Sequence, residues 1–109
     1  MKLIQIENTK TPALTKQVYN TDLGYTVKVV TVGIDTHITA TPQPEVLWIA
    51  PIVSFISKES RSLEIKNTVV SMEDVPIFAE WVNRASKLLE YIYEHYDELV
   101  PQNENEIEK

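Results

Sequence analysis

The sequence predicts an α+β protein, in which an antiparallel sheet of about five or six strands is followed by one long C-terminal amphipathic helix. Up to about residue 71 the chain is rich in Val, Ile, Thr and Tyr, which favour strands. Beyond that point apolar residues recur at helical spacing. Strands that all precede the helix indicate this class. The 109 residues fit one domain. We place it at 1–100, with the strands in 1–71 and the helix in 72–100.

The first part contains seven segments of strand character separated by polar turns: Leu3–Ile6, Ala13–Tyr19, Tyr25–Val32, Ile34–Thr41, Val46–Ala50, Ile52–Ser57 and Ser62–Val70. Gly24 suits a turn because glycine tolerates positive φ. Gly33 either closes a tight hairpin or marks a bulge in one long bent strand that ends at Thr41. We favour the bulge. Pro51 indicates an edge, a bulge or a short break between the fifth and sixth segments.

The helix is predicted to begin near Ser71, which forms an S-x-x-D start with Asp74. Pro76 lies where the first turn tolerates proline. One stripe of apolar residues follows with alternating spacings of 4 and 3: Phe78, Val82, Ala85, Leu89, Ile92, Tyr96 and Leu99. Trp81 and Leu88 widen this stripe on one side.

A continuous helix over Val75–Val100 would be roughly 39 Å long at about 1.5 Å per residue. A five-stranded sheet is only about 24 Å across. We therefore expect the helix to overhang the sheet, and its end from Leu88 on to pair with a partner helix in a two-fold homodimer. The alternative is that the stripe only covers the sheet.

The net charge is -6, and it is unevenly distributed. Residues 1–72 hold seven bases and six acids, or +1, whereas residues 73–109 hold ten acids and three bases, or -7. We expect a solvated acidic helix face and a disordered acidic tail over residues 101–109.

A side patch of Arg84, Tyr91 and His95 falls together on the helix at 100° per residue. Arginine and tyrosine are enriched in binding hot spots, so the patch is a candidate partner-binding site. The alternative is that these residues shield the edge of the core.

The sequence offers little for catalysis. It has no cysteine and only two histidines, which argues against zinc, iron–sulfur and thiol chemistry. Asp35 and His37 share a strand face but have no third ligand nearby, and His95 and Glu98 are spaced for a salt bridge. Nucleophile-elbow, Walker and dinucleotide-binding motifs are all missing. We expect no enzyme activity, no metal, no cofactor and no small-molecule substrate.

The chain is also expected to be cytoplasmic, without a membrane anchor. The acid Glu7 comes too early for a signal peptide. The longest apolar stretch, Val46–Ile56, is far short of the roughly 20 residues of a membrane helix.

These features favour a small non-enzymatic interaction or regulatory protein, an adaptor or an inhibitor of the kind that phages and mobile elements encode, which binds a protein partner or itself. A second, less favoured alternative is an acidic inhibitor that mimics nucleic acid. The main alternative is a protein that binds single-stranded nucleic acid, which would combine basic and aromatic residues. Its candidate residues are Lys16, Lys28, Lys58, Arg61, Lys66, Tyr25 and Trp48. The order of elements over residues 1–100 is similar in architecture to the transcriptional-coactivator and whirly group of single-strand binders, without a matched motif.

Overall fold

A computed structural model describes residues 1–66 and 69–100 and confirms the predicted α+β class. Six strands form one sheet in the order β1-β2-β3-β4-β5-β6, and every neighbouring pair is antiparallel. The strands are β1 (Leu3–Lys10), β2 (Leu14–Thr21), β3 (Tyr25–Val32), β4 (Asp35–Pro42), β5 (Ile52–Phe55) and β6 (Arg61–Glu64). A short 3-10 helix, η1 (Pro44–Val46), follows β4, and the helices α1 (Val75–Glu94) and α2 (Tyr96–Leu99) follow β6.

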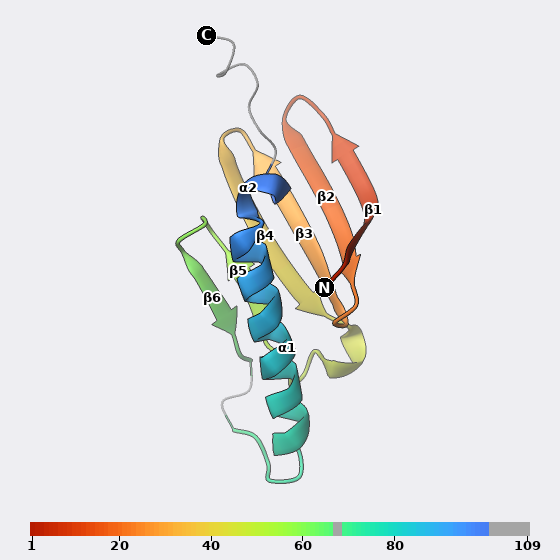
Figure 1. Cartoon of the computed structure of the whole chain (residues 1–109), viewed down its shortest axis with the longest axis vertical. Coiled ribbons are helices and arrows are strands. Elements are labelled where there is room, and N and C mark those ends of the chain that lie inside the picture. Colours follow the sequence, from red (N-terminus) through yellow and green to blue (C-terminus); the bar gives the residue numbers. More distant parts are fainter. Residues whose placement is uncertain (67–68, 101–109) are drawn as a thin grey trace.

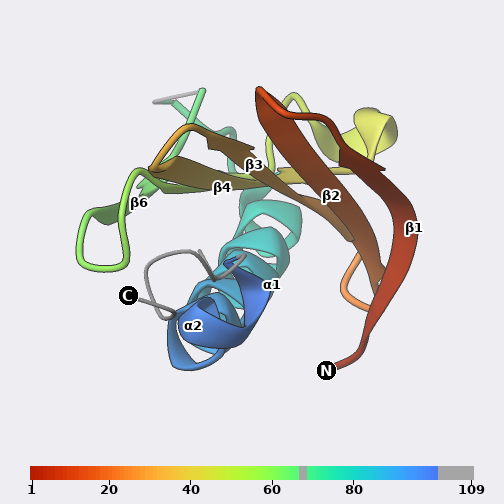
Figure 2. The same ribbon diagram turned by 90° about the horizontal axis from the view of Figure 1, so that it is seen from above.

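The molecule has two layers, with α1 lying against one face of the sheet (Figures 1 and 2). Val27 pairs with Ala40 and Val29 pairs with Ile38, and paired residues share a face of the sheet. These four side chains are buried. The helix contributes buried residues at spacings of 4, 3 and 4: Trp81, Ala85, Leu88 and Ile92. The core therefore lies between α1 and the central strands.

Gly33 lies in a hairpin turn, so the predicted bulge is wrong. Val32 pairs with Asp35, which leaves a two-residue loop of Gly33 and Ile34 between β3 and β4. Gly33 has φ of 64°, whereas no residue other than glycine has a positive φ among those described. A positive φ at the first loop position alone is the pattern of a type II′ turn, which matches the twist of the strands. The bulge lies instead in β1, between Gln5 and Glu7.

The segment Val46–Ala50 was predicted as a strand but forms helical turns. Pro44 begins η1, where its fixed φ favours a helical start. The Ala50 N–H then donates to the carbonyl of Val46 at 2.8 Å. The last strand also differs, because the predicted strand was Ser62–Val70 and β6 ends at Glu64; residues 67 and 68 of the prediction lie outside the described residues.

The predicted continuous helix is interrupted at His95, where φ is -106° and ψ is 17°. The hydrogen bonds around the break stay short, since the His95 N–H donates to the Tyr91 carbonyl at 3.0 Å. Beyond the break the Tyr96 ring lies 6.0 Å from the Phe55 ring, and Leu99 packs against the core. The break thus directs the last turn toward the sheet. The predicted acidic tail at 101–109 lies outside the described residues.

The first turn of α1 also differs from the prediction. The helix begins at Val75, and Asp74 is its N-cap residue, although the Asp74 side chain makes no capping hydrogen bond. The Ser71 hydroxyl donates instead to the Asp74 carboxylate at 3.0 Å. Ser71 and Asp74 therefore stabilise the turn before the helix.

The loop between β2 and β3 fastens the sheet to the helix. Trp81 packs on Tyr25 with ring centroids 5.6 Å apart, and the Arg84 guanidinium lies 4.5 Å from the Trp81 ring. Arg84 also donates to the carbonyl of Leu23 at 3.2 Å. Gly24 has φ of 80°, and a Cβ atom added there would lie 2.8 Å from Cη2 of Trp81. The absence of a side chain at Gly24 is what lets the indole approach this loop.

We predict that Gly24→Ala lowers the free energy of unfolding by about 2–5 kcal/mol, because positive φ and a clash with Trp81 add together. Gly33→Ala is the matched control. Gly33 also has positive φ, but an added Cβ would meet nothing within 4 Å, so a loss of only about 1–2 kcal/mol is expected. Urea denaturation of both variants measures the difference. Equal losses would contradict the role assigned to the contact between Gly24 and Trp81.

Candidate protein-interaction surfaces

The N-terminal turns of α1 project past the ends of the strands (Figure 1). At 100° per residue, five of their residues lie within an arc of about 100°. We name this arc the overhang face, and its residues are Val75, Phe78, Ala79, Val82 and Ser86. Val75 is 43% exposed, while Phe78 and Val82 are partly buried but do not pack against the buried core. The overhang face therefore presents apolar surface that the described part of the chain leaves partly uncovered.

Further apolar residues are exposed at the same end of the helix. Ile77 is 43% exposed, and Met72, in the turn before α1, is 87% exposed. At 100° per residue Ile77 falls outside the arc of the overhang face, and single exposed apolar residues of this kind are common on protein surfaces.

The overhang face carries no charged residue. Between Val75 and Ser86 the only charged residues are Glu80 and Arg84, which lie on the other side of the helix and form an ion pair with each other. The charged residues Lys87, Glu90 and Glu94 follow in the second half of α1. Charge is thus uneven along the helix. Glu80 and Arg84 cancel in the first half, whereas Lys87, Glu90 and Glu94 give the second half a net charge of -1, and we name this second half the acidic half.

The predicted stripe is divided between the core and the overhang face. Ala85 and Ile92 are fully buried in the core. Leu89, Tyr96 and Leu99 are partly buried and pack against the core. Only Phe78 and Val82 of the predicted stripe lie outside it. The part of the stripe outside the core is therefore its N-terminal end, whereas the segment from Leu88 on packs against the protein's own sheet.

The predicted side patch is also divided. Arg84 is held by the carbonyl of Leu23 and by Glu80. The Tyr91 and His95 rings contact each other with centroids 4.2 Å apart. Nδ1 of His95 lies 3.2 Å from both carboxylate oxygens of Glu98, as the spacing in the sequence suggested. Tyr91 and His95 therefore form a pair without Arg84.

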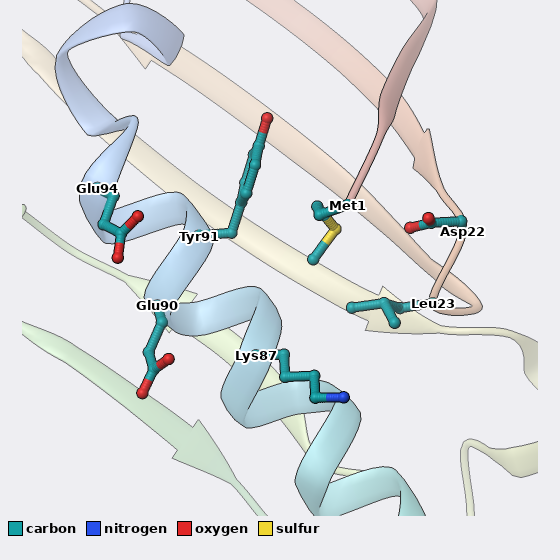
Figure 3. A pocket seen from close by; sticks show the side chains of 7 residues that line it. All are labelled: Met1, Asp22, Leu23, Lys87, Glu90, Tyr91 and Glu94. Carbon is teal, nitrogen blue, oxygen red and sulfur yellow. The ribbon is translucent and has the colours of Figure 1, made fainter.

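Tyr91 lines an open crevice of about 380 Å³ between α1 and the loop that joins β2 to β3 (Figure 3). The residues that line it are Met1, Asp22, Leu23, Lys87, Glu90, Tyr91 and Glu94. Figure 3 shows the Glu90 carboxylate turned away from Met1 and Leu23. Residues 1–66 and 69–100 contain no group of three or more His, Cys, Asp or Glu residues that could hold a metal ion.

The basic residues of the nucleic-acid alternative are spread over the molecule. Lys28 pairs with Val18 across β2 and β3 and so lies on the sheet face away from α1, as does Lys16, whereas Arg61 pairs with Phe55 on the face toward α1. Lys66 is exposed beyond the end of β6.

Two of the basic residues near β6 join the sheet to the helices. Lys58 lies 3.7 Å from the Asp97 carboxylate, and the Arg61 guanidinium lies 4.2 Å from the Tyr93 ring. The Lys58 ammonium is also 5.3 Å from that ring. These contacts connect the turn between β5 and β6 to the C-terminal end of α1 and to α2.

Two aromatic residues were candidates for stacking on bases, and the structure separates them. Trp48 is 50% exposed, and its indole N–H donates to the carbonyl of Glu45 at 3.1 Å. Tyr25 is only 2% exposed, so its ring is inaccessible and its predicted role in stacking is wrong. The Tyr25 hydroxyl donates to the carbonyl of Pro51 at 2.7 Å. Tyr25 is a core residue that connects β3 to the start of β5.

Sequence reasoning located Phe78 and Val82 but missed Val75, Ala79 and Ser86 as members of the same face. The signal that could have found them is the absence of charge on this side of the helix before Lys87. Periodicity alone could not show it, because small residues contribute little to an apolar stripe.

Comparisons with known proteins do not identify the chain: no protein-family description, no curated protein and no solved structure matches it. Among the described residues, none of the helices is both long and apolar enough to cross a membrane.

The pKa of Tyr25 gives a pH-dependent test of its burial. Desolvation raises this pKa to about 12 from 10.0, against the smaller lowering effect of the Arg84 charge. The pKa of Tyr25 is higher in the folded than in the unfolded protein. The contribution of its neutral hydroxyl to the free energy of unfolding is therefore fully present below pH 10 and is lost as the pH rises toward 12.

We predict that Tyr25→Phe loses about 1 kcal/mol at pH 8, from the missing hydrogen bond to Pro51. We also expect its stability to fall less steeply between pH 10 and 12 than that of the parent protein. Urea midpoints at pH 8 and pH 11 measure both effects. Tyr19 and Tyr96 also have raised pKa values but are present in both proteins. Parallel pH profiles would contradict the burial of a neutral Tyr25 hydroxyl.

Proposed function

We propose that the protein is a small non-enzymatic interaction protein, an adaptor or inhibitor, that binds a protein partner through the overhang face. The observation that carries this proposal is the position of Phe78 and Val82. The N-terminal end of α1 extends past the sheet (Figure 1), and within the described residues Phe78 and Val82 are partly buried but do not pack against the core.

The energetics of binding favour this face. Fully burying a Val or Phe side chain is worth about 1.5–3 kcal/mol. Burying a charged group without a partner is costly, and the overhang face has no such group to desolvate. The Glu80 and Arg84 pair lies on the other side of the helix, so it stays hydrated when the face is covered. A partner can therefore cover the apolar face without burying a charge.

The acidic half of α1 supplies a second element of recognition. Lys87 is accompanied by Glu90 and Glu94 on the exposed side of the helix, and Asp97 and Glu98 follow in α2. Charges at the edge of an interface mainly set the association rate and the orientation of the partner. In this proposal the overhang face provides affinity and the acidic half provides selectivity.

The single-stranded nucleic-acid alternative has less support. Of its two aromatic candidates, Tyr25 is buried and only Trp48 is exposed, and its basic residues lie on both faces of the sheet. A binder of this kind would be expected to join basic and aromatic residues in one groove.

We predict that a photo-reactive p-benzoylphenylalanine in place of Val82 forms a discrete protein adduct upon irradiation in an extract of the cells that make the protein. The same residue in place of Ile34 is the control, because Ile34 is 87% exposed in the β3–β4 turn, at the opposite end of the molecule (Figure 1). Adding Phe78→Glu should remove the adduct at position 82. Equal labelling from positions 82 and 34, or an adduct that survives Phe78→Glu, would count against the proposed function.

A further inference from the structure

We infer that the partner of the overhang face is a second copy of this chain, bound as an antiparallel, two-fold pair of α1 helices. This inference rests on the proposed function and specifies its partner. It moves the helix pairing from the C-terminal part of the helix, which is buried in the protein's own core, to the N-terminal half of α1.

The spacing of the apolar residues suits such a pair. Val75, Phe78 and Val82 follow one another at intervals of 3 and 4, which is the repeat of a helix–helix seam. We place the two-fold axis close to residue 80. Phe78 of one copy then lies opposite Val82 of the second copy, and Val82 of the first copy lies opposite Phe78 of the second.

Small residues occupy the positions where the two helices would come closest. Ala79 lies next to the two-fold axis, where a small side chain permits close approach of the two backbones. Ser86 of one copy lies opposite Val75 of the other, which places a small residue against a larger one. Large side chains against small ones allow the two surfaces to interdigitate.

The distribution of charge favours the antiparallel direction. Each copy carries a net charge of -6, and residues 73–109 hold ten of its sixteen acids. A parallel pair would place the two acidic halves of α1 side by side, where like charges repel. An antiparallel pair moves them to opposite ends of the assembly, and only the uncharged overhang faces meet. Antiparallel helix dipoles add a smaller favourable contribution.

The size of the face indicates a weak dimer. The face spans about three turns of one helix. We expect the area that such a strip buries to be smaller than the roughly 800 Å² per partner of a standard stable interface. We therefore expect a dissociation constant on the order of micromolar, so that monomer and dimer exchange over ordinary working concentrations.

Sedimentation equilibrium of the purified full chain, over concentrations from sub-micromolar to several hundred micromolar, tests the dimer. We expect a monomer–dimer equilibrium in the parent protein and more than tenfold weaker association for Val82→Glu, since each substitution acts twice across the two-fold axis. Ile34→Glu is the matched control because it makes a similar change from an apolar to an acidic residue at an exposed site, and its association should be unchanged. Urea denaturation verifies that both variants remain folded.

Disulfide trapping tests the direction of the pair, because the chain has no cysteine of its own. Ala79→Cys should cross-link with itself rapidly under mild oxidation. Ser86→Cys, which lies far from the axis, should remain monomeric alone but cross-link with Val75→Cys in a mixture. Rapid self-cross-linking of Ser86→Cys would indicate a parallel pair and overturn the antiparallel arrangement.

The outcomes separate this inference from the proposed function. A protein that stays monomeric at the highest concentration overturns the dimer. If position 82 nevertheless labels a different protein in the extract, the proposed function stands with another partner. If the protein is monomeric and position 82 labels nothing beyond the Ile34 control, both fail.

Discussion

The contact between one helix and one face of the sheet is the constraint on which the rest of the structure depends. Within the described residues, α1 and α2 cover the apolar face of the six-stranded sheet, and the buried side of α1 consists of Trp81, Ala85, Leu88 and Ile92. The contact also needs the loop at Gly24, because Trp81 can reach Tyr25 only where no side chain intervenes. The position of the helix along the sheet follows from this contact, and that position determines which residues of α1 remain uncovered.

Local sequence signals predicted the elements whose character is decided locally. The alternation of Tyr25–Val32 and the helical repeat after residue 74 gave the right class and the right order. The errors arose where two conformations have similar local preference. Gly33 suits a bulge and a turn equally, and the pairing of Val32 with Asp35 decides between them. The break at His95 likewise has no signal in the sequence, because it depends on how the last turn meets Phe55.

The candidate site was only half predictable for a related physical reason. Periodicity identifies an apolar stripe, but it cannot say which part the protein's own sheet will cover. Ile92 and Val82 belong to the same predicted stripe, yet Ile92 is fully buried and Val82 lies outside the core. The distinction comes from where the strands end, which is a property of the whole fold. Tyr25 illustrates the same limit, since an aromatic residue in a strand can face solvent or the core.

The order of the sheet has a consequence for how the chain acquires its structure. Each strand lies beside its neighbour in sequence, so hairpins can form one after another with short loop closures, which favours rapid folding. The helix that seals the core comes last in the chain. During synthesis, the apolar side chains of Val27, Val29 and Ile38 therefore stay exposed to solvent until α1 has left the ribosome. A sheet in this state can aggregate with another nascent chain if translation of the helix is delayed.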